Sequence, residues 1–196
     1  MYVRANHPDE IERAYDYFWE EEYPEDFLRG TALDVGFINF EDWLLCDWRM
    51  KDGKGFIDLF TEADKGLSKA DLEALSGMKD SVISLYEAKS VSPEVALYDL
   101  LLGQEFYLGK ETARFKKGDV FAARLLKSGS GYVMGPCVYP FGKDRKEKAL
   151  ADMRKQFDRF RKNENPVGTM REFLKSHSYI FNTIWVSNIR GAMDIF

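Results

Sequence analysis

Apolar side chains recur at helical spacing near both ends of the chain. The apolar positions of the first segment follow one another at steps of three or four residues: Ile11, Ala14, Tyr15 and Phe18. This is the spacing of one face of a helix. Pro8 and the two acids after it suit the start of that helix, and Pro24 is expected to end it. The pattern predicts helices at 8–22, 25–47, 69–76 and 143–163, and from Thr169 to about 190.

Two helix starts carry a capping signal. Ser68 precedes Asp71 by three residues, and Thr169 precedes Glu172 by the same step. A hydroxyl at the cap and an acid three residues later satisfy each other's free backbone N–H groups. We expect both helices to begin directly after these caps, and Gly77 to lie just past the end of the helix at 69–76.

The middle of the chain changes from helical spacing to alternation. Apolar and polar positions alternate over 81–89, 95–101, 105–108, 120–126 and 132–139, with turn residues between them. The sequence SGSG at 128–131 is the clearest hairpin signal. Short strands joined by tight turns are typical of a small barrel. We therefore predict an α+β protein with a small antiparallel five-stranded β-barrel flanked by N-terminal and C-terminal helices.

Charged residues are distributed unevenly between the two halves of the chain. Residues 1–99 carry 10 Lys and Arg against 23 Asp and Glu, whereas residues 100–196 carry 18 against 10. We predict an acidic helical segment at 1–80, the barrel at 81–140 and a basic helical segment at 141–196, packed as one compact unit. The contrast could hold two halves together, or it could present one face to a charged partner.

Sequence motifs of zinc sites, serine nucleophiles and nucleotide-binding loops are missing from this sequence. It has two cysteines, Cys46 and Cys137, and two histidines, His7 and His177, without zinc-ligand spacing. It has no GxSxG, GxxxxGK[ST] or GxGxxG pattern. We therefore predict no catalytic residues, metal or cofactor, a hydrogen-bonded structural role for His177, and buried reduced thiols. The first ten residues lack the apolar core of a secretory signal, and no stretch approaches a membrane span, so a cytoplasmic location without membrane contact is expected.

The helix predicted at 143–163 is the best candidate for contact with a partner. Its candidate binding residues are the cations Arg145, Lys148, Arg154, Lys155, Arg159 and Arg161, together with Tyr132 of the barrel. One interpretation is a solvated charged face above an apolar one. The other is an electrostatic surface for nucleic acid, with barrel rings such as Tyr132 available to stack on bases. The acidic run at 20–22, with Glu25 and Asp26, could likewise bind a cation or a basic partner, or be a solvated helix end.

Two stretches of the barrel resemble a known group of proteins. The residues SLYEAKSVSPEVALYDLLLGQEFYL (84–108) and KKGDVFAARLL (116–126) are similar to an uncharacterised bacterial family related to proteins that carry a SecA-type C-terminal zinc motif. The lead-in at 27–48 also resembles that group. The zinc motif's cysteine cluster is absent here, so no metal role carries over. The resemblance implies the fold and no activity, and it singles out Asp99 and Arg124 as polar positions that bind each other or the backbone of a turn.

Three hypotheses for function follow. The first is a non-enzymatic binding or interaction module with a protein partner or a second copy of itself. The second is a nucleic-acid-binding protein that uses the basic helix and the barrel. The third, an enzyme of unrecognised type, rests only on acids near aromatic segments.

Overall fold

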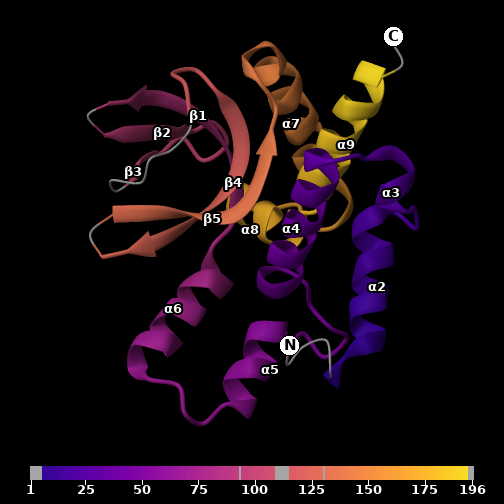
Figure 1. Ribbon diagram of the computed structural model, residues 1–196, viewed down its shortest axis with the longest axis vertical. Coiled ribbons are helices and arrows are strands. Elements are labelled where there is room, and N and C mark those ends of the chain that lie inside the picture. The colour runs from indigo at the N-terminus through magenta and orange to yellow at the C-terminus, as the bar shows by residue number, and fades with distance from the viewer. Residues whose placement is uncertain (1–5, 93, 109–114, 130, 194–196) are drawn as a thin grey trace. The chain divides into compact units, whose positions relative to one another are not determined.

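The computed structural model describes residues 6–92, 94–108, 115–129 and 131–193 (Figure 1). Pro93 and Ser130, which lie in two of the predicted turns, are outside the described residues. The chain forms two compact units, unit 1 at Met1–Ser81 and unit 2 at Val82–Phe196. Unit 1 carries 9 Lys and Arg against 20 Asp and Glu, a net charge of −11, and unit 2 carries 19 against 13, a net charge of +6. The charge contrast of the sequence therefore follows the division of the fold.

Unit 1 is helical over its described residues. Its elements are α2 (Pro8–Trp19), α3 (Pro24–Phe27), α4 (Thr31–Cys46), α5 (Phe56–Ala63) and α6 (Lys69–Asp80). The single helix predicted at 25–47 is wrong, because the chain breaks between α3 and α4. Leu28 is extended there, and Gly30 has φ +53° and ψ −133°, a conformation that only glycine adopts readily.

The end of α2 also differs from the prediction. Pro24 does not end this helix but begins α3. The helix ends because Glu20 and Glu21 both adopt left-handed backbone conformations, with φ of 56° and 61°. Their N–H groups both bond to the carbonyl of Asp16. Two consecutive left-handed residues that are not glycine are unusual, and they turn the chain sharply at this point.

A cluster of aromatic rings forms the core of unit 1. Phe18 is fully buried, and its ring centroid lies 5.0 Å from that of Trp19, 5.4 Å from Phe40 and 5.0 Å from Trp43. These separations are typical of aromatic pairs that pack edge to face or tilted. Gly36 lets Trp19 approach α4, since a Cβ at this position would lie 2.9 Å from the tip of the indole ring. Aromatic rings thus fill the core where α2 packs on α4.

The start of α6 confirms the capping prediction, whereas its end does not. The Ser68 hydroxyl accepts from the N–H of Asp71, and the Asp71 carboxylate accepts from the N–H of Ser68. Gly77 lies inside the helix, which continues to Asp80. The Ser81 N–H bonds to the Gly77 carbonyl, so this glycine takes part in the last turn instead of following it.

Unit 2 contains the five-stranded sheet that the alternating pattern predicts. The strands are β1 (Ile83–Val91), β2 (Val95–Asp99), β3 (Glu105–Leu108), β4 (Val120–Ser128) and β5 (Gly131–Pro140). They are hydrogen-bonded in the order β1-β2-β3-β5-β4, and β4 pairs with β1, so the sheet closes on itself. The prediction that all pairs are antiparallel is wrong, because β3 and β5 pair in parallel at Leu108 and Tyr132.

Alternation along the strands fills the inside of the closed sheet with apolar side chains. The buried residues of this core are Tyr86, Ala88, Val95, Leu97, Leu108, Phe121, Ala123 and Leu125. In β1, β2 and β4 they follow at steps of two, as required when successive side chains point to opposite faces. The other face of β1 is also buried at Ile83 and Leu85.

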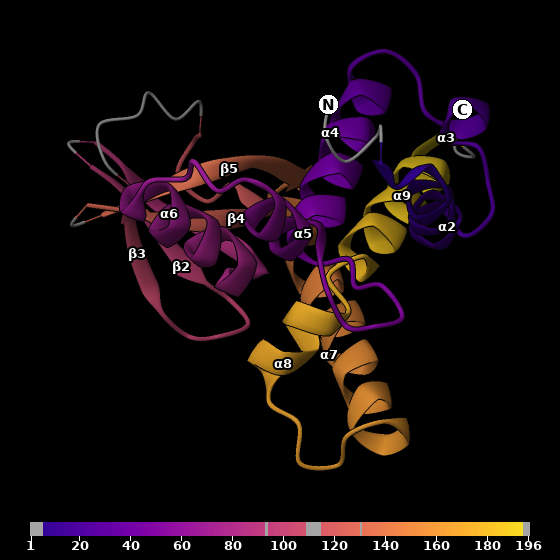
Figure 2. The same ribbon diagram turned by 90° about the horizontal axis from the view of Figure 1, so that it is seen from below.

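Helices follow the sheet and pack against it. They are η1 (Lys143–Arg145), α7 (Lys146–Asn163), α8 (Met170–Ser176) and α9 (Ile180–Met193). Within unit 2, α8 contacts β1 and α9 contacts β5, and α7 contacts both helices (Figure 2). The predicted cap at Thr169 is confirmed, but the helix it starts is interrupted between Ser176 and Ile180 instead of running on to residue 190. None of the described helices is both long and apolar enough to cross a membrane.

Candidate functional site

Helix α7 has one apolar side and one charged side. Ala149, Leu150, Met153 and Phe160 are buried. Lys155, Arg159 and Lys162 are exposed and follow one another at steps of four and three residues, which places them on one face. Lys155 is two positions from the half-buried Phe157, about 200° around the helix from it. The charged face therefore points away from the core of unit 2.

The fold uses several cations of the basic segment internally. Arg145 donates to the side-chain oxygen of Asn188 at 3.0 Å. Lys146 pairs with Glu87 at 2.7 Å, and Lys148 pairs with Asp152 at 2.7 Å. Two predicted binding residues, Arg145 and Lys148, thus have partners within unit 2.

Glu87 of β1 anchors the start of α7. Its carboxylate accepts from Lys146 at 2.7 Å and from Lys89 at 2.8 Å, and its side chain is 17% exposed. The hydrogen bonds from Lys146 and then from Lys89 hold the pKa of Glu87 below its usual value, although burial acts in the opposite direction. This pair joins an acid of the first half of the sequence to a base of the second half.

Replacing Glu87 with glutamine is expected to destabilise unit 2 by about 1 kcal/mol, because the amide cannot form an ion pair with Lys146. The pKa of Glu87 in the folded protein is lower than its unfolded value of 4.5. The ionised carboxylate therefore stabilises unit 2 fully above pH 4.5, and this contribution is lost as the pH falls through the folded pKa. Urea unfolding at pH 7 and pH 3 measures both effects. Asp152→Asn, which breaks the more exposed pair with Lys148, should cost less than half as much; an equal cost would contradict the anchoring role of Glu87.

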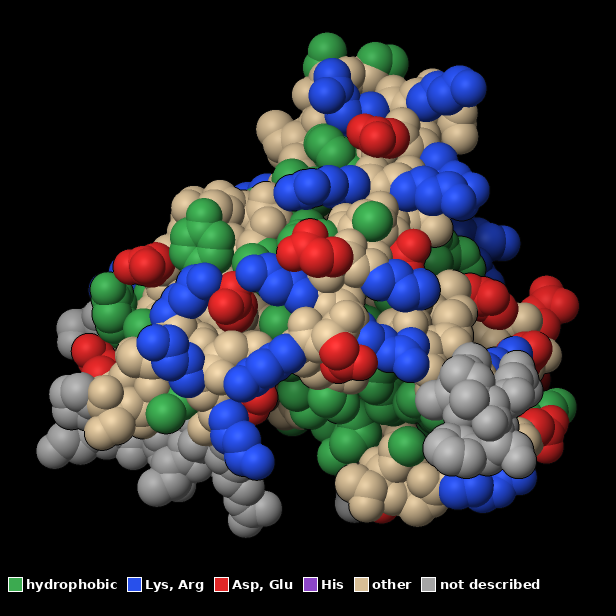
Figure 3. All heavy atoms as spheres, turned by 90° about the horizontal axis from the view of Figure 1, so that it is seen from above, with side chains coloured by type: hydrophobic (Ala, Val, Ile, Leu, Met, Phe, Trp, Pro, Cys, Tyr) green, Lys and Arg blue, Asp and Glu red, His purple; other side chains and the backbone are tan. Residues whose placement is uncertain are grey.

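Three exposed cations that share one face of α7 form what we call the cationic stripe: Lys155, Arg159 and Lys162. Among the described residues, Lys155 and Lys162 have no ion-pair or hydrogen-bond partner, and Arg159 has only a 3.4 Å contact with Gln156. Arg154 is also exposed and unpaired within the described part of the chain. In Figure 3, Lys and Arg side chains gather over the region of unit 2 where Figure 2 places the end of α7. Arg161 is held separately, by the Pro166 carbonyl and over the ring of Phe157.

Tyr132 does not lie beside the cationic stripe as a free ring. It is half-buried and packs edge to face on Phe106, with ring centroids 4.9 Å apart. Its ring contacts the core of the closed sheet. Tyr139, another barrel ring, is completely buried. Tyr132 and Tyr139 are therefore occupied by packing, whereas Tyr107 of β3 is 49% exposed.

His177 lies between two hydrogen-bonding side chains and a group of rings. Its Nδ1 is 2.8 Å from the Ser176 hydroxyl, and its Nε2 is 3.2 Å from Glu164. The Ser176 hydroxyl is also 2.9 Å from the Glu172 carbonyl at the end of α8. The ring stacks on Phe173 at 5.4 Å. Both ring nitrogens of His177 thus have hydrogen-bond contacts, and a structural role for this residue stays a prediction.

Asp99 is a buried carboxylate at the end of β2. Its Oδ1 accepts from the Ser84 hydroxyl at 2.7 Å and from the N–H groups of Leu101 and Leu102 at 2.9 and 2.8 Å. Asp99 therefore binds the backbone of the turn after β2, which is one of the two alternatives that the sequence predicts for it. Its Oδ2 is buried and has no hydrogen-bond partner among the residues that the structure describes. Burial raises the pKa of this carboxyl, against the lowering effect of its three donors. Arg124 is also fully buried.

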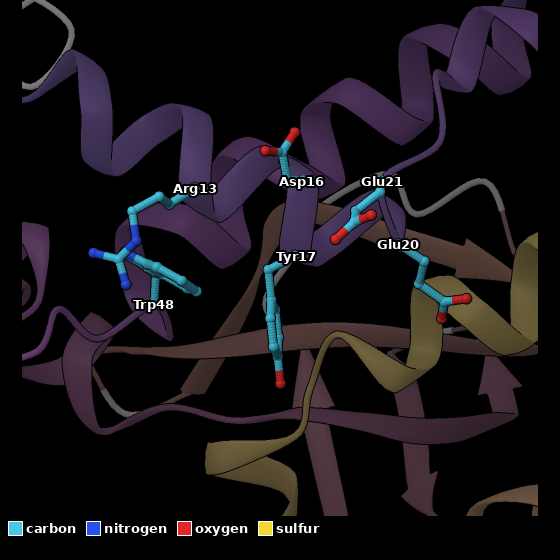
Figure 4. A pocket seen from close by; sticks show the side chains of 6 residues that line it. All are labelled: Arg13, Asp16, Tyr17, Glu20, Glu21 and Trp48. Atoms are coloured by element: carbon cyan, nitrogen blue, oxygen red, sulfur yellow. The ribbon is translucent and has the colours of Figure 1, made fainter.

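A hollow of about 480 Å³ lies in unit 1, beside the end of α2. Its lining residues are Arg13, Asp16, Tyr17, Glu20, Glu21 and Trp48. Figure 4 shows Tyr17 between Arg13 and Trp48 on one side and Glu20 and Glu21 on the other, with the Asp16 carboxylate pointing away. The acids belong to the run noted in the sequence. Sequence reasoning missed Tyr17 and Trp48, since 31 positions separate them and no local pattern connects them.

The described residues hold no group of three or more His, Cys, Asp or Glu side chains placed to bind a metal ion.

In comparison with known proteins, a family model described as "Family of unknown function (DUF7986)" matches residues 39–178. No curated protein and no solved structure matches the chain. The matched range includes the stretches at 84–108 and 116–126, but its description says nothing of SecA-related proteins, so that resemblance stays a prediction.

Proposed function

The chain belongs to this family of unknown function, and we propose that it is a non-enzymatic interaction module that binds an acidic protein surface through the cationic stripe of α7. The observation that carries the proposal is the division of the α7 cations. Those at the start of the helix are paired within unit 2, whereas Lys155 and Lys162 are exposed and unpaired among the described residues. Unit 2 as a whole carries a net charge of +6.

The stripe has the dimensions of a small protein contact. From Lys155 to Lys162 the helix rises about 10 Å, and Arg154 lies beside this face. Exposed cations of this kind contribute mainly to the rate and specificity of association, because complementary potentials steer the partners together. The methylene stems of Lys and Arg can also cover apolar surface, while their charged groups stay in water.

An acidic protein suits the molecule better than nucleic acid does. Tyr132 and Tyr139 are committed to packing, and the hydroxyl of the exposed Tyr107 bonds to the acid Glu105, whose charge would repel a nucleic-acid phosphate beside that ring. The same chain carries a unit with a net charge of −11, which would repel a long polyanion.

The support for a non-enzymatic role comes from the polar groups themselves. The Ser176 hydroxyl lies 2.9 Å from the backbone carbonyl of Glu172 as well as 2.8 Å from His177 Nδ1, and Asp99 binds a turn from inside the core. Neither group lines the hollow beside the end of α2.

The proposal predicts weak, salt-sensitive binding of an acidic polypeptide. A fluorescein-labelled peptide of twelve alternating Glu and Gly residues should bind at 20 mM NaCl, with affinity at least tenfold lower at 200 mM, because salt screens exposed charges. The variant Lys155→Glu/Arg159→Glu/Lys162→Glu should abolish the anisotropy change. Lys116→Glu/Lys117→Glu/Lys127→Glu changes three exposed cations elsewhere in unit 2 by the same charge and should leave most of the binding.

Equal loss of peptide binding in both variants would show that only net charge matters, and would overturn the stripe as the binding surface.

A single-stranded oligonucleotide that carries the same charge as the peptide is the second probe. If it binds more than tenfold tighter than the peptide and the stripe variant abolishes that binding, the partner is nucleic acid and the assignment to an acidic protein is wrong.

A further inference from the structure

The side of α2 that is turned away from the core of unit 1 is acidic. Asp9, Glu12 and Asp16 follow one another at steps of three and four residues, and all three side chains are exposed. Asp16 is two positions from the buried Phe18, about 200° around the helix from it. Among the described residues, none of these three carboxylates forms an ion pair or a hydrogen bond. We call Asp9, Glu12 and Asp16 the acidic row.

The acidic row of α2 matches the cationic stripe of α7 in length and in shape. Both run over seven residues, so the end residues of each lie about 10 Å apart along the helix and within about 20° of each other around it. Viewed down each helix, the middle residue is displaced by about 50° from the ends, Arg159 to one side and Glu12 to the other. These opposite displacements coincide when the two helices face each other and run in the same direction.

In this arrangement every cation of the stripe faces an acid of the row. The pairs are Lys155 with Asp9, Arg159 with Glu12 and Lys162 with Asp16. The exposed Asp158 of α7 then falls on the same flank as Arg13 of α2, which pairs with Glu10 at 2.5 Å in its own molecule. The charges beside the two rows are therefore also opposite in sign, and no like charges are brought together.

We propose that the acidic partner of the cationic stripe is a second copy of this chain, which presents the acidic row of its α2. This inference rests on the proposed function and names the partner. Each molecule carries both a unit of net charge −11 and a unit of net charge +6, so copies attract one another through unlike units. In a two-fold dimer the set of pairs forms twice. Exposed ion pairs are individually weak, so the dimer is weak and sensitive to salt.

Sedimentation velocity of the full chain tests this contact. At about 0.5 mM protein, the wild type should contain dimer in about 20 mM NaCl and be monomeric in about 500 mM NaCl, because salt screens exposed charges. The stripe variant is Lys155→Glu/Arg159→Glu/Lys162→Glu, and the row variant is Asp9→Lys/Glu12→Lys/Asp16→Lys. Each alone should dimerise at least tenfold more weakly, because like charges then face each other. An equimolar mixture of the two variants restores opposite charges in both contacts and should form dimers about as well as the wild type.

Two further variants control for net charge. Lys116→Glu/Lys117→Glu/Lys127→Glu changes exposed cations of unit 2 outside α7, and Glu25→Lys/Asp26→Lys/Asp34→Lys changes exposed acids of unit 1 outside α2. Both should dimerise within about threefold of the wild type, since screening confines the effect of a charge to its surroundings. If the mixture of stripe and row variants stays monomeric, or if the controls lose as much dimer as those variants do, the row does not contact the stripe and the inference is wrong.

The acidic peptide separates this inference from the proposed function. A wild type that is monomeric at low salt, but whose stripe still binds the peptide, would overturn self-association and leave the proposed function standing. If dilute, monomeric wild type did not bind the peptide, the proposed function would fail and this inference with it.

Discussion

Replacing Phe18 with alanine is expected to lower the free energy of unfolding of unit 1 by about 3–5 kcal/mol. Phe18 is completely buried, and its ring lies within about 5 Å of three other rings in the core between α2 and α4. The substitution removes the transfer energy of the ring and leaves a cavity that Trp19, Phe40 and Trp43 cannot fill without leaving their own contacts. Urea unfolding followed by tryptophan fluorescence measures it, because Trp19, Trp43 and Trp48 all lie in unit 1.

Two control substitutions test whether the loss of stability comes from the buried ring of Phe18. Phe18→Leu keeps most of the buried volume and should cost less than half as much. Val167→Ala changes a side chain that is 87% exposed and should change stability by less than about 0.5 kcal/mol. If Phe18→Ala cost less than 1 kcal/mol, the aromatic cluster would not be the packed core of unit 1.

Replacing Asp99 with alanine is expected to cost about 3 kcal/mol in unit 2. Three donors converge on its Oδ1, and each would lose its acceptor in a buried environment, at about 1 kcal/mol or more per donor. The turn after β2 should loosen, since Leu101 and Leu102 supply two of these donors. Urea unfolding followed by circular dichroism of the sheet measures the loss. Ser84→Ala, which removes one of the three bonds, should cost about 1 kcal/mol; a larger cost than Asp99→Ala would contradict this account.

The conservative variant Asp99→Asn isolates the charge of this group. Burial raises the folded pKa of Asp99 above its unfolded value of 3.8. The protonated carboxyl is therefore favoured by folding, and its contribution is full below pH 3.8 and lost as pH rises through the folded value. Wild-type stability relative to Asp99→Asn should decrease across that window and stay constant above it. Parallel stability curves for the two proteins between pH 3.5 and pH 8 would contradict the shift.

The elements that could be predicted are those set by local interactions. The boxes at Ser68 and Thr169 involve partners three residues apart, so their effect does not depend on the rest of the fold. The strands of unit 2 were recognisable because alternation at steps of two marks a side buried in a core, and β3 has the predicted bounds. Helix α7 was recognisable from one apolar and one charged face.

Elements of ambiguous local preference were predicted less well. A single helix at 25–47 matched the apolar pattern, but the conformation of Gly30 splits it into α3 and α4. Pro24 could end one helix or begin the next, and in the fold it begins α3. Gly77 is tolerated inside α6, where a Cβ would meet no neighbouring atom, so its presence did not signal an end.

The sequence by itself determined the α+β class, the number of strands, the caps and the amphipathic character of α7, because each depends on residues close together in the chain. Only the tertiary structure decided which cations of α7 are paired, since Glu87 and Asn188 are distant in sequence from Lys146 and Arg145. It also decided the parallel contact of β3 with β5, the burial of Asp99 and the meeting of Tyr17 with Trp48. These features depend on long-range packing, which places side chains together without leaving a periodic trace in the sequence.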